Sequence, residues 1–195
     1  MGGLDKGLQP WRGQALTLWV LHALRPQASL IGISANRNMH TYEQLLRQST
    51  EDQQACDLGV HPDDPDLPRF SGPIAGILTG LRKSQTEWVQ LASCDTPQLP
   101  YDLVERLLAA AIESNADVAV PSTQEVNPMG ASERRLHWTC ALLHKRVTPD
   151  LANSFVMNNR KVGQWIQSQR WVAVSFNSTT EFKNMNTLET LDERD

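Results

Sequence analysis

The chain lacks the features that mark membrane proteins and general nucleic-acid binders. No apolar run approaches the roughly 18 residues of a membrane span, and no secretory signal peptide is recognisable. Basic residues are not in excess, since 18 Lys and Arg against 22 Asp and Glu give a formal net charge of -4. A general nucleic-acid or anionic-membrane binder needs a basic surface. We therefore expect neither a nucleic acid nor a membrane as a partner.

Cysteine is scarce, and the common metal and nucleophile motifs are missing. The three cysteines, Cys56, Cys94 and Cys140, are far apart and form no C-x-x-C pair. Such an odd, scattered set predicts reduced thiols and a cytoplasmic protein. No H-x-x-x-H, H-E-x-x-H or G-x-S-x-G occurs, so zinc chemistry and a covalent nucleophile have little support.

Short apolar runs alternate with amphipathic stretches, which is typical of an α/β domain on a parallel sheet. The patterns predict strands at 30–34, 88–92, 117–120 and 171–176, and helices at 16–24, 73–81 and 103–111. Prolines and acids predict a loop over 61–73, and residues 124–135 read as a second polar loop. At 195 residues without a linker, the chain is expected to form one domain over 1–195.

The first seven residues, MGGLDKG, have the composition of a phosphate-binding loop. Glycines let the backbone approach an anion, and Lys6 adds a mobile positive charge. Such a loop normally follows a buried strand, but no strand precedes it in this sequence. By itself Lys6 is more readily read as a solvated surface charge than as a functional residue.

Two other segments fall where an open parallel sheet binds ligands, after the carboxyl ends of strands or at a helix start. Asp95 follows the apolar strand 88–92 and precedes Pro97, which places it to hold Mg²⁺ or to cap the next helix. Gly72 and Gly76 flank a helix start, whose backbone N–H groups can face an anion or a base edge.

Taken in order, these segments resemble the molybdenum cofactor guanylyltransferases, also called molybdopterin-guanine dinucleotide synthases. The resemblance covers essentially the full length and rests on five segments: MGGLDKGL at 1–8, NR at 36–37, GPIAG at 72–76, CDTP at 94–97 and NMNT at 184–187. It implies a three-layer, mostly parallel, Rossmann-like nucleotidyltransferase fold of the GT-A type. It also implies an enzyme that transfers GMP from GTP to the terminal phosphate of molybdenum-molybdopterin and releases pyrophosphate, with Mg²⁺.

The resemblance assigns roles to residues that match the family's motifs. Lys6 and Asp95 are the implied catalytic residues, and Asp95 is the implied magnesium ligand. The implied GTP-binding residues are Lys6, Ser34, Asn36, Asp63, Gly72, Gly76 and Asp95, with Asp64 as an alternative to Asp63. The implied residues on the pterin side are Arg160, Lys161, Asn184 and Asn186.

The chain departs from the family pattern at three places. Ser34 stands where the family has asparagine, and Ser93 where it has proline. The family motif also begins with a strand and an L-A-G-G loop, which this sequence lacks ahead of Met1. We expect a start site placed too late, and a domain without its first strand that has an exposed sheet edge or a gap in its core.

Two other functions stay open at this point. One is a molybdopterin cytidylyltransferase, and the other is a catalytically impaired, pterin-binding remnant. The implied partners are GTP and molybdenum-molybdopterin, together with molybdenum-insertion proteins and molybdoenzyme chaperones.

Overall fold

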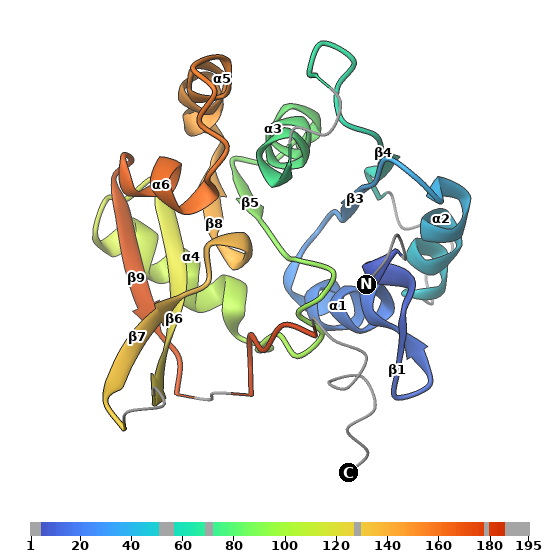
Figure 1. Cartoon of the computed structure of the whole chain (residues 1–195), viewed down its shortest axis with the longest axis horizontal. Coiled ribbons are helices and arrows are strands. Elements are labelled where there is room, and N and C mark those ends of the chain that lie inside the picture. The colour runs from blue at the N-terminus through green and yellow to red at the C-terminus, as the bar shows by residue number, and fades with distance from the viewer. Residues whose placement is uncertain (1–4, 51–56, 69–71, 127–129, 178–179, 186–195) are drawn as a thin grey trace.

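The computed structural model of the chain describes residues 5–50, 57–68, 72–126, 130–177 and 180–185. Its elements are, in chain order (Figure 1), η1 (Lys6–Leu8), β1 (Pro10–Trp11), β2 (Gln14–Ala15), α1 (Leu16–Leu24), η2 (Arg25–Gln27), β3 (Gly32–Ser34), α2 (Met39–Gln48), β4 (Gly59–His61), α3 (Pro73–Lys83), β5 (Trp88–Gln90), α4 (Leu103–Glu113), β6 (Val118–Val126), β7 (Ser132–Leu136), η3 (Trp138–Cys140), β8 (Leu142–His144), η4 (Lys145–Val147), α5 (Thr148–Val156), α6 (Val162–Gln167) and β9 (Trp171–Ser175).

A five-stranded sheet forms the centre of the molecule. Its order is β5-β8-β6-β7, and β9 also pairs with β6. Because β8 is antiparallel to both β5 and β6, and β9 is parallel to β6, the strands β5, β6 and β9 run in one direction. β3 and β4 form a separate parallel pair, and β1 and β2 a small antiparallel hairpin. The α/β class predicted from the alternating pattern is confirmed.

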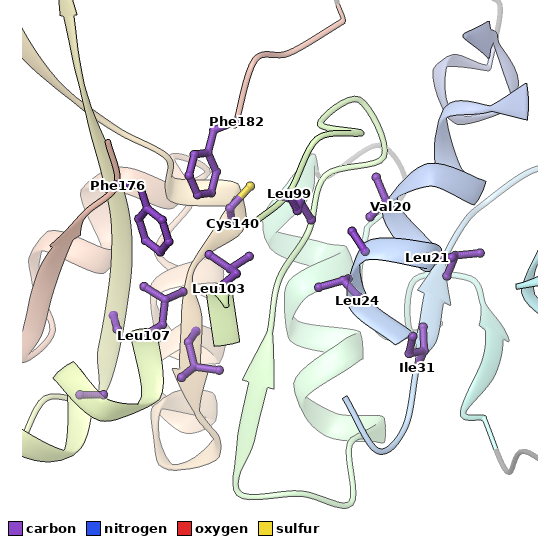
Figure 2. Close-up of a cluster of buried hydrophobic side chains, with 14 of the residues drawn as sticks. Val20, Leu21, Leu24, Ile31, Leu99, Leu103, Leu107, Cys140, Phe176 and Phe182 are labelled. Carbon is purple, nitrogen blue, oxygen red and sulfur yellow. The ribbon is translucent and has the colours of Figure 1, made fainter. Parts of the chain in front are cut away.

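Helices cover both faces of the sheet and make three layers. On one face, α1 and α4 pack in a cluster that includes Leu24, Leu103 and Leu107, drawn in Figure 2. On the other face, α3, α5 and α6 pack in a second cluster. Neighbouring residues of β6 alternate between the clusters, since Ala119 belongs to the first and Val118 to the second. Within the described ranges, no helix is both long and apolar enough to cross a bilayer.

The predicted helices and strands are present, but the predicted polar loop over 124–135 is wrong. β6 extends to Val126, and Ser132–Leu136 forms β7, antiparallel to it. The pairing places Gln124 opposite Arg134, and Arg135 forms an ion pair with Glu125 at 3.1 Å. The polar residues of this segment belong to a solvent-exposed hairpin. Polar cross-strand pairs stabilise such a hairpin as apolar pairs do.

The β3–β4 pair and the five-stranded sheet do not form one continuous sheet. β3 pairs with β4, and β5 pairs with β8. A cavity of about 790 Å³ lies between β3 and β5, in a space that α1, α3 and α4 also line. The exposed edge or core gap expected from the sequence is present, and it lies between these two strands.

The C-terminal strap, residues 180–185, crosses the carboxyl end of the sheet. Phe182 is 1% exposed and stacks on His137, with 4.6 Å between ring centroids. The backbone N–H of Met185 donates to the Asp95 carbonyl at 2.8 Å, and that of Phe182 donates to the Gln98 carbonyl at 3.4 Å. The strap is therefore fastened to the segment that carries Asp95.

His137 should make the stability of this region depend on pH. Burial, with Arg135 nearby, lowers the pKa of His137 to about 4, from 6.5. Between pH 6.5 and about pH 4, His137 is protonated in the unfolded chain but stays neutral in the folded chain. The free energy of unfolding should therefore fall across this window, by at most about 1.4 kcal/mol per pH unit. Urea titrations at pH 7, 6, 5 and 4.5 should show a smaller fall for His137→Gln, and parallel curves would contradict this assignment.

Candidate functional site

Asp95 lies at the carboxyl end of β5, in a short loop that its neighbours hold in place. Its side chain is 12% exposed, and its Oδ2 lies 3.7 Å from Lys6 Nζ. The Ser93 hydroxyl donates to the Asp95 Oδ1 at 2.5 Å. The fold brings Lys6 and Asp95 together from segments far apart in the chain, as expected for two groups acting on one substrate.

The turn that carries Lys6 is fixed from both sides. Tyr42 of α2 donates its hydroxyl to Asp5 Oδ1 at 2.6 Å, and Asn38 donates to Asp5 Oδ2 at 3.0 Å. Burial and this bond to Asp5 raise the pKa of Tyr42, which keeps its hydroxyl protonated. A Cβ on Gly7 would lie 2.5 Å from Thr17 Oγ1, so no other residue fits there. Lys6 itself is 44% exposed and faces the open edge of the sheet.

A second group of predicted residues lies at the carboxyl end of β3. Asn36 and Asp63 are joined twice, because Asn36 Nδ2 donates to Asp63 Oδ2 at 2.9 Å and the Asp63 N–H donates to Asn36 Oδ1 at 2.9 Å. A Cβ on Gly76 would lie 2.9 Å from Ser34 Oγ and 3.7 Å from Asp63 Oδ1. The structure therefore gathers Ser34, Asn36, Asp63 and Gly76 around the start of α3.

Asp64 holds the loop before α3 in place, and Gly72 forms the turn at the start of that helix. Asp64 accepts from Arg82 at 2.9 Å, and its N–H donates to Thr79 Oγ1, so it fastens the loop to α3. This pairing favours Asp63 over Asp64 as the residue that faces a ligand. Gly72 has φ +73° at the N-terminal end of α3, a conformation that favours glycine. The helix start predicted at Pro73 is confirmed.

Of the four residues predicted on the pterin side, the three that the structure describes do not lie together. Asn184 lies beside the Asp95 loop, where its Oδ1 accepts from the Thr96 hydroxyl at 3.0 Å. Arg160 and Lys161 lie between α5 and α6, on the opposite side of the molecule from β3 and α2 (Figure 1). The Arg160 guanidinium stacks 3.7 Å from the Phe155 ring centroid and donates to the Phe155 carbonyl. Asn186 lies outside the described residues.

The two cysteines in the described ranges are neutral thiols. Burial, with Asp95 next in effect, raises the pKa of Cys94 to about 11. Burial also raises the pKa of Cys140 to about 11. Neither group is a thiolate at neutral pH, so neither is activated as a nucleophile.

The oxygen ligands at the carboxyl edge of the sheet suit a hard cation whose remaining ligands come from the substrate. No group of three or more His, Cys, Asp and Glu side chains that could hold a metal occurs among residues 5–50, 57–68, 72–126, 130–177 and 180–185. Asp95 supplies carboxylate oxygens at a largely buried position beside the open edge. Mg²⁺ is commonly bound by one or two carboxylates, with phosphate oxygens and waters as its other ligands. The residues present fit such a site.

Comparison with known proteins decides the family. The model of the MobA-like NTP transferase domain matches residues 1–173. This chain belongs to the MobA-like NTP transferase family. As a member, it is a nucleotidyltransferase, and the enzyme class predicted from its motifs is confirmed.

Similar proteins carry names that agree with this assignment. The molybdenum cofactor guanylyltransferase of Ralstonia pickettii (strain 12J) is 37% identical over 191 residues, which are 98% of this chain and 87% of the relative. The guanylyltransferase of the same name from Bordetella petrii is 33% identical over 188 residues, 96% of this chain and 87% of that protein.

Solved structures show the same fold at lower identity. Molybdopterin-guanine dinucleotide biosynthesis protein A from Archaeoglobus fulgidus has a TM-score of 0.67 at 19% identity, over 97% of this chain and 88% of the other. 2-C-methyl-D-erythritol 4-phosphate cytidylyltransferase from Thermus thermophilus has a TM-score of 0.64 at 17% identity, over 95% and 90%. The nucleotidyltransferase is therefore Rossmann-like, as the resemblance implied.

Sequence reasoning missed the residues that support this nucleotidyltransferase site. Asp5 and Tyr42 anchor the Lys6 turn, and Ser93 and Thr96 orient Asp95 and Asn184. An acid beside the lysine of a glycine-rich turn was a usable signal for Asp5. For Tyr42 the signal was the helical spacing of Met39, Tyr42 and Leu46, which was not used because α2 was not predicted as a helix.

Proposed function

We propose that this protein transfers GMP from GTP to the terminal phosphate of molybdenum-molybdopterin and releases pyrophosphate. The observation that carries the proposal is the 3.7 Å approach of Lys6 Nζ to Asp95 Oδ2 at the open carboxyl edge. The names of relatives at 33% to 37% identity support the substrates. Attack at the α-phosphate passes through a state rich in negative charge, which a metal-holding carboxylate and a lysine can neutralise.

Each residue of the Asp95 loop has a separate part in this reaction. Asp95 would hold Mg²⁺, which would supply positive charge to neutralise the phosphates. Ser93 fixes the carboxylate through its hydrogen bond, and the exposed ammonium of Lys6 stabilises charge on the departing pyrophosphate. The phosphate of the pterin substrate attacks, so the protein needs no nucleophile of its own.

The cluster of Ser34, Asn36, Asp63 and Gly76 is the proposed place of the base. It offers a hydroxyl, an amide and a carboxylate beside Gly76, whose lack of a side chain lets the Ser34 hydroxyl approach closely. An amide N–H can donate to O6 of guanine, and a carboxylate can accept from the N1–H and N2–H groups of its Watson–Crick edge. Gly72 supplies the tight backbone turn that opens α3 next to this cluster.

On the pterin side, Asn184 is favoured by its position. Its Oδ1 accepts from Thr96, which turns its amide nitrogen away from Thr96 as a donor for a phosphate. Roles for Arg160, Lys161 and Asn186 in pterin binding stay predictions, as do chaperone partners, a cytoplasmic location and a single domain over 1–195.

A nucleotide competition assay tests the proposed function. Purified protein, molybdenum-molybdopterin and Mg²⁺ are incubated with equal GTP and CTP, and the two dinucleotide products are separated by chromatography. We expect guanine dinucleotide in about a hundredfold excess, because polar groups matched to one base are left unpaired by the other. A cytosine product in excess would identify a cytidylyltransferase. Binding of the pterin without either product would identify a pterin-binding remnant.

Replacing Gly76 with alanine should selectively weaken the binding of GTP. The new Cβ would lie 2.9 Å from Ser34 Oγ, inside the proposed base site. We expect KM for GTP to rise roughly tenfold with a small change in kcat, because one methyl group in a tight pocket costs about 1–3 kcal/mol. Steady-state kinetics measures both constants, and the thermal midpoint controls for folding. An unchanged KM in a folded variant would remove Gly76 from the base site.

A further inference from the structure

The strand β9 ends the five-stranded sheet on one side with an apolar edge. Among the residues that the structure describes, β6 is the only strand that pairs with β9. Figure 1 shows β9 at the left side of the molecule, with β6 beside it. The five residues of β9, Trp171–Ser175, include no charged residue and no proline. Natural sheets commonly protect an edge with such residues, because an unprotected edge pairs readily with another strand.

β7, another outer strand of the same sheet, differs in this respect. Three of its five residues, Glu133, Arg134 and Arg135, are charged. These charges disfavour the pairing of β7 with a further strand, and β9 has no comparable protection. The contrast points to β9 as the edge that another strand covers.

One edge of β9 is bonded to β6 through alternate residues. The Val118 N–H donates to the Arg170 carbonyl at 3.2 Å, and the Phe176 N–H donates to the Ser122 carbonyl at 2.8 Å. Alternate residues of a strand bond to the same neighbour. The even-numbered residues from 170 to 176 therefore bond to β6, and the odd-numbered residues of β9 direct their backbone groups to the open edge.

The open edge of β9 is complementary to itself. Its outward residues, Trp171, Ala173 and Ser175, are evenly spaced about Ala173. An antiparallel second copy of β9 would bring Ala173 opposite Ala173 of the second copy, and Trp171 opposite Ser175 of the second copy. Each of these pairs can exchange two N–H···O bonds. Arg106 already donates to the Ser175 carbonyl, which has a second lone pair for the N–H of the second copy.

The side chains along this edge suit the same pairing. Ala173, the smallest residue of β9, would meet its own copy at the two-fold axis, so no bulky side chains collide there. Val172 would lie opposite Val174 of the second copy, and β-branched pairs stabilise an antiparallel ladder. Both valines are partly buried and pack against the cluster under α4. The pairing would therefore continue this apolar layer from one copy into the other.

The start of β9 carries an excess of basic groups. Arg146 Nε lies 2.7 Å from Asp117 Oδ1, and Arg170 Nε lies 2.8 Å from Asp117 Oδ2. Two guanidinium groups thus share one carboxylate. Arg170 directly precedes β9 and is 54% exposed, so its charge is available to a second chain.

The end of β9 carries the opposite excess. Arg106, which bonds the Ser175 carbonyl, pairs with Asp102 at 3.5 Å, and Glu181 interacts electrostatically with both. Two carboxyl groups thus share one guanidinium. Antiparallel pairing places the start of one β9 beside the end of the other, so the basic group of each copy would face the acidic group of the other.

We propose that β9 pairs antiparallel with β9 of a second copy of this chain and joins two five-stranded sheets across a two-fold axis at Ala173. A two-fold axis uses the same edge of both copies and closes the assembly at two chains. One strand pair with few side chains around it is a small interface, so we expect a dissociation constant on the order of micromolar. The proposal concerns assembly and holds whether or not the protein transfers GMP.

Light scattering after size-exclusion chromatography of the full chain tests the proposal. Between about 0.1 and about 100 µM protein, the average mass should rise from one chain to two. The amides of Trp171, Ala173 and Ser175 should exchange about tenfold more slowly at the high concentration, since they become part of a ladder. A protein that stays monomeric overturns the proposal. So does a dimer in which these amides exchange as fast as they do in the monomer.

Ala173→Pro separates the pairing of β9 from its folding. Proline is tolerated on an edge strand where the N–H points outward, so the monomer should keep its thermal midpoint. The dimer loses two central hydrogen bonds, and its dissociation constant should rise roughly a hundredfold. Ser132→Pro is the matched control, because Ser132 begins the outer strand β7. It should change the dissociation constant by less than about twofold.

Asp102→Lys tests the charge pattern without altering β9, and it serves where the proline variant does not fold. The new cation would face the arginines of the second copy, so the dissociation constant should rise about tenfold at low salt and less at about 0.5 M NaCl. Asp66→Lys is its control, since Asp66 is also exposed and also pairs with an arginine, Arg82 of α3. A dimer that neither Ala173→Pro nor Asp102→Lys weakens would use another surface and would overturn the proposal.

Discussion

Asp95→Asn should lower kcat/KM for guanine dinucleotide formation by about a hundred- to a thousandfold. Asparagine keeps the shape of the side chain and can keep the bond from Ser93, but it removes the charge that faces Lys6 at 3.7 Å. Losing one group aimed at transition-state charge typically costs a factor of this size. Pyrophosphate release at varied GTP and varied Mg²⁺ measures the loss, and the apparent affinity for Mg²⁺ should weaken with it.

The matched control for this variant is Asp102→Asn. Asp102 is 54% exposed and pairs with Arg106 near the start of α4, away from Lys6. It should leave turnover within about twofold of the parent, because exposed pairs contribute little. Full activity of a folded Asp95→Asn protein would disprove the role given to Asp95.

Phe182→Ala should lower the free energy of unfolding by about 3–5 kcal/mol, the usual cost of removing a fully buried aromatic ring. Phe182 is 1% exposed, stacks on His137 and lies edge-on to Phe176 at 5.2 Å. The loss is a large part of the roughly 5–15 kcal/mol that holds a domain of this size folded. Urea unfolding followed by tryptophan fluorescence measures it.

The same variant should also disturb the Asp95 loop. Phe182 anchors the strap whose Met185 N–H binds the Asp95 carbonyl and whose Asn184 binds Thr96. Turnover should therefore fall even at temperatures where the variant is folded. Tyr101→Ala is the control, since Tyr101 is 79% exposed and should change the free energy of unfolding by less than about 0.5 kcal/mol. A Phe182→Ala protein with parental stability would show that the strap contributes little.

Local patterns predicted the elements that end at the site. The apolar run before Asp95 became β5, and Gly72 with Pro73 began α3 where the sequence placed it. These predictions succeeded because a buried strand and a proline-initiated helix each carry their signal within a few neighbouring residues.

Elements whose support comes from distant parts of the chain were missed. α2 buries only Tyr42 and Leu46, and although Met39, Tyr42 and Leu46 have helical spacing, this short and mostly polar segment was not predicted as a helix. β7 is exposed along four of its five residues and owes its form to pairing with β6. The pairing of Asn36 with Asp63 depends on how β3 and β4 align, which no local pattern records.

The hydrogen bond from Thr96 to Asn184 also bears on the order in which the site is built during synthesis. The two residues are 88 positions apart, so the loop that carries Asp95 is made long before the strap that fastens it. Closing a contact over so much chain is entropically costly and slow compared with forming a helix. β5 and Asp95 therefore leave the ribosome before the strap that supports them, and the edge that carries Asp95 is completed among the last folding events.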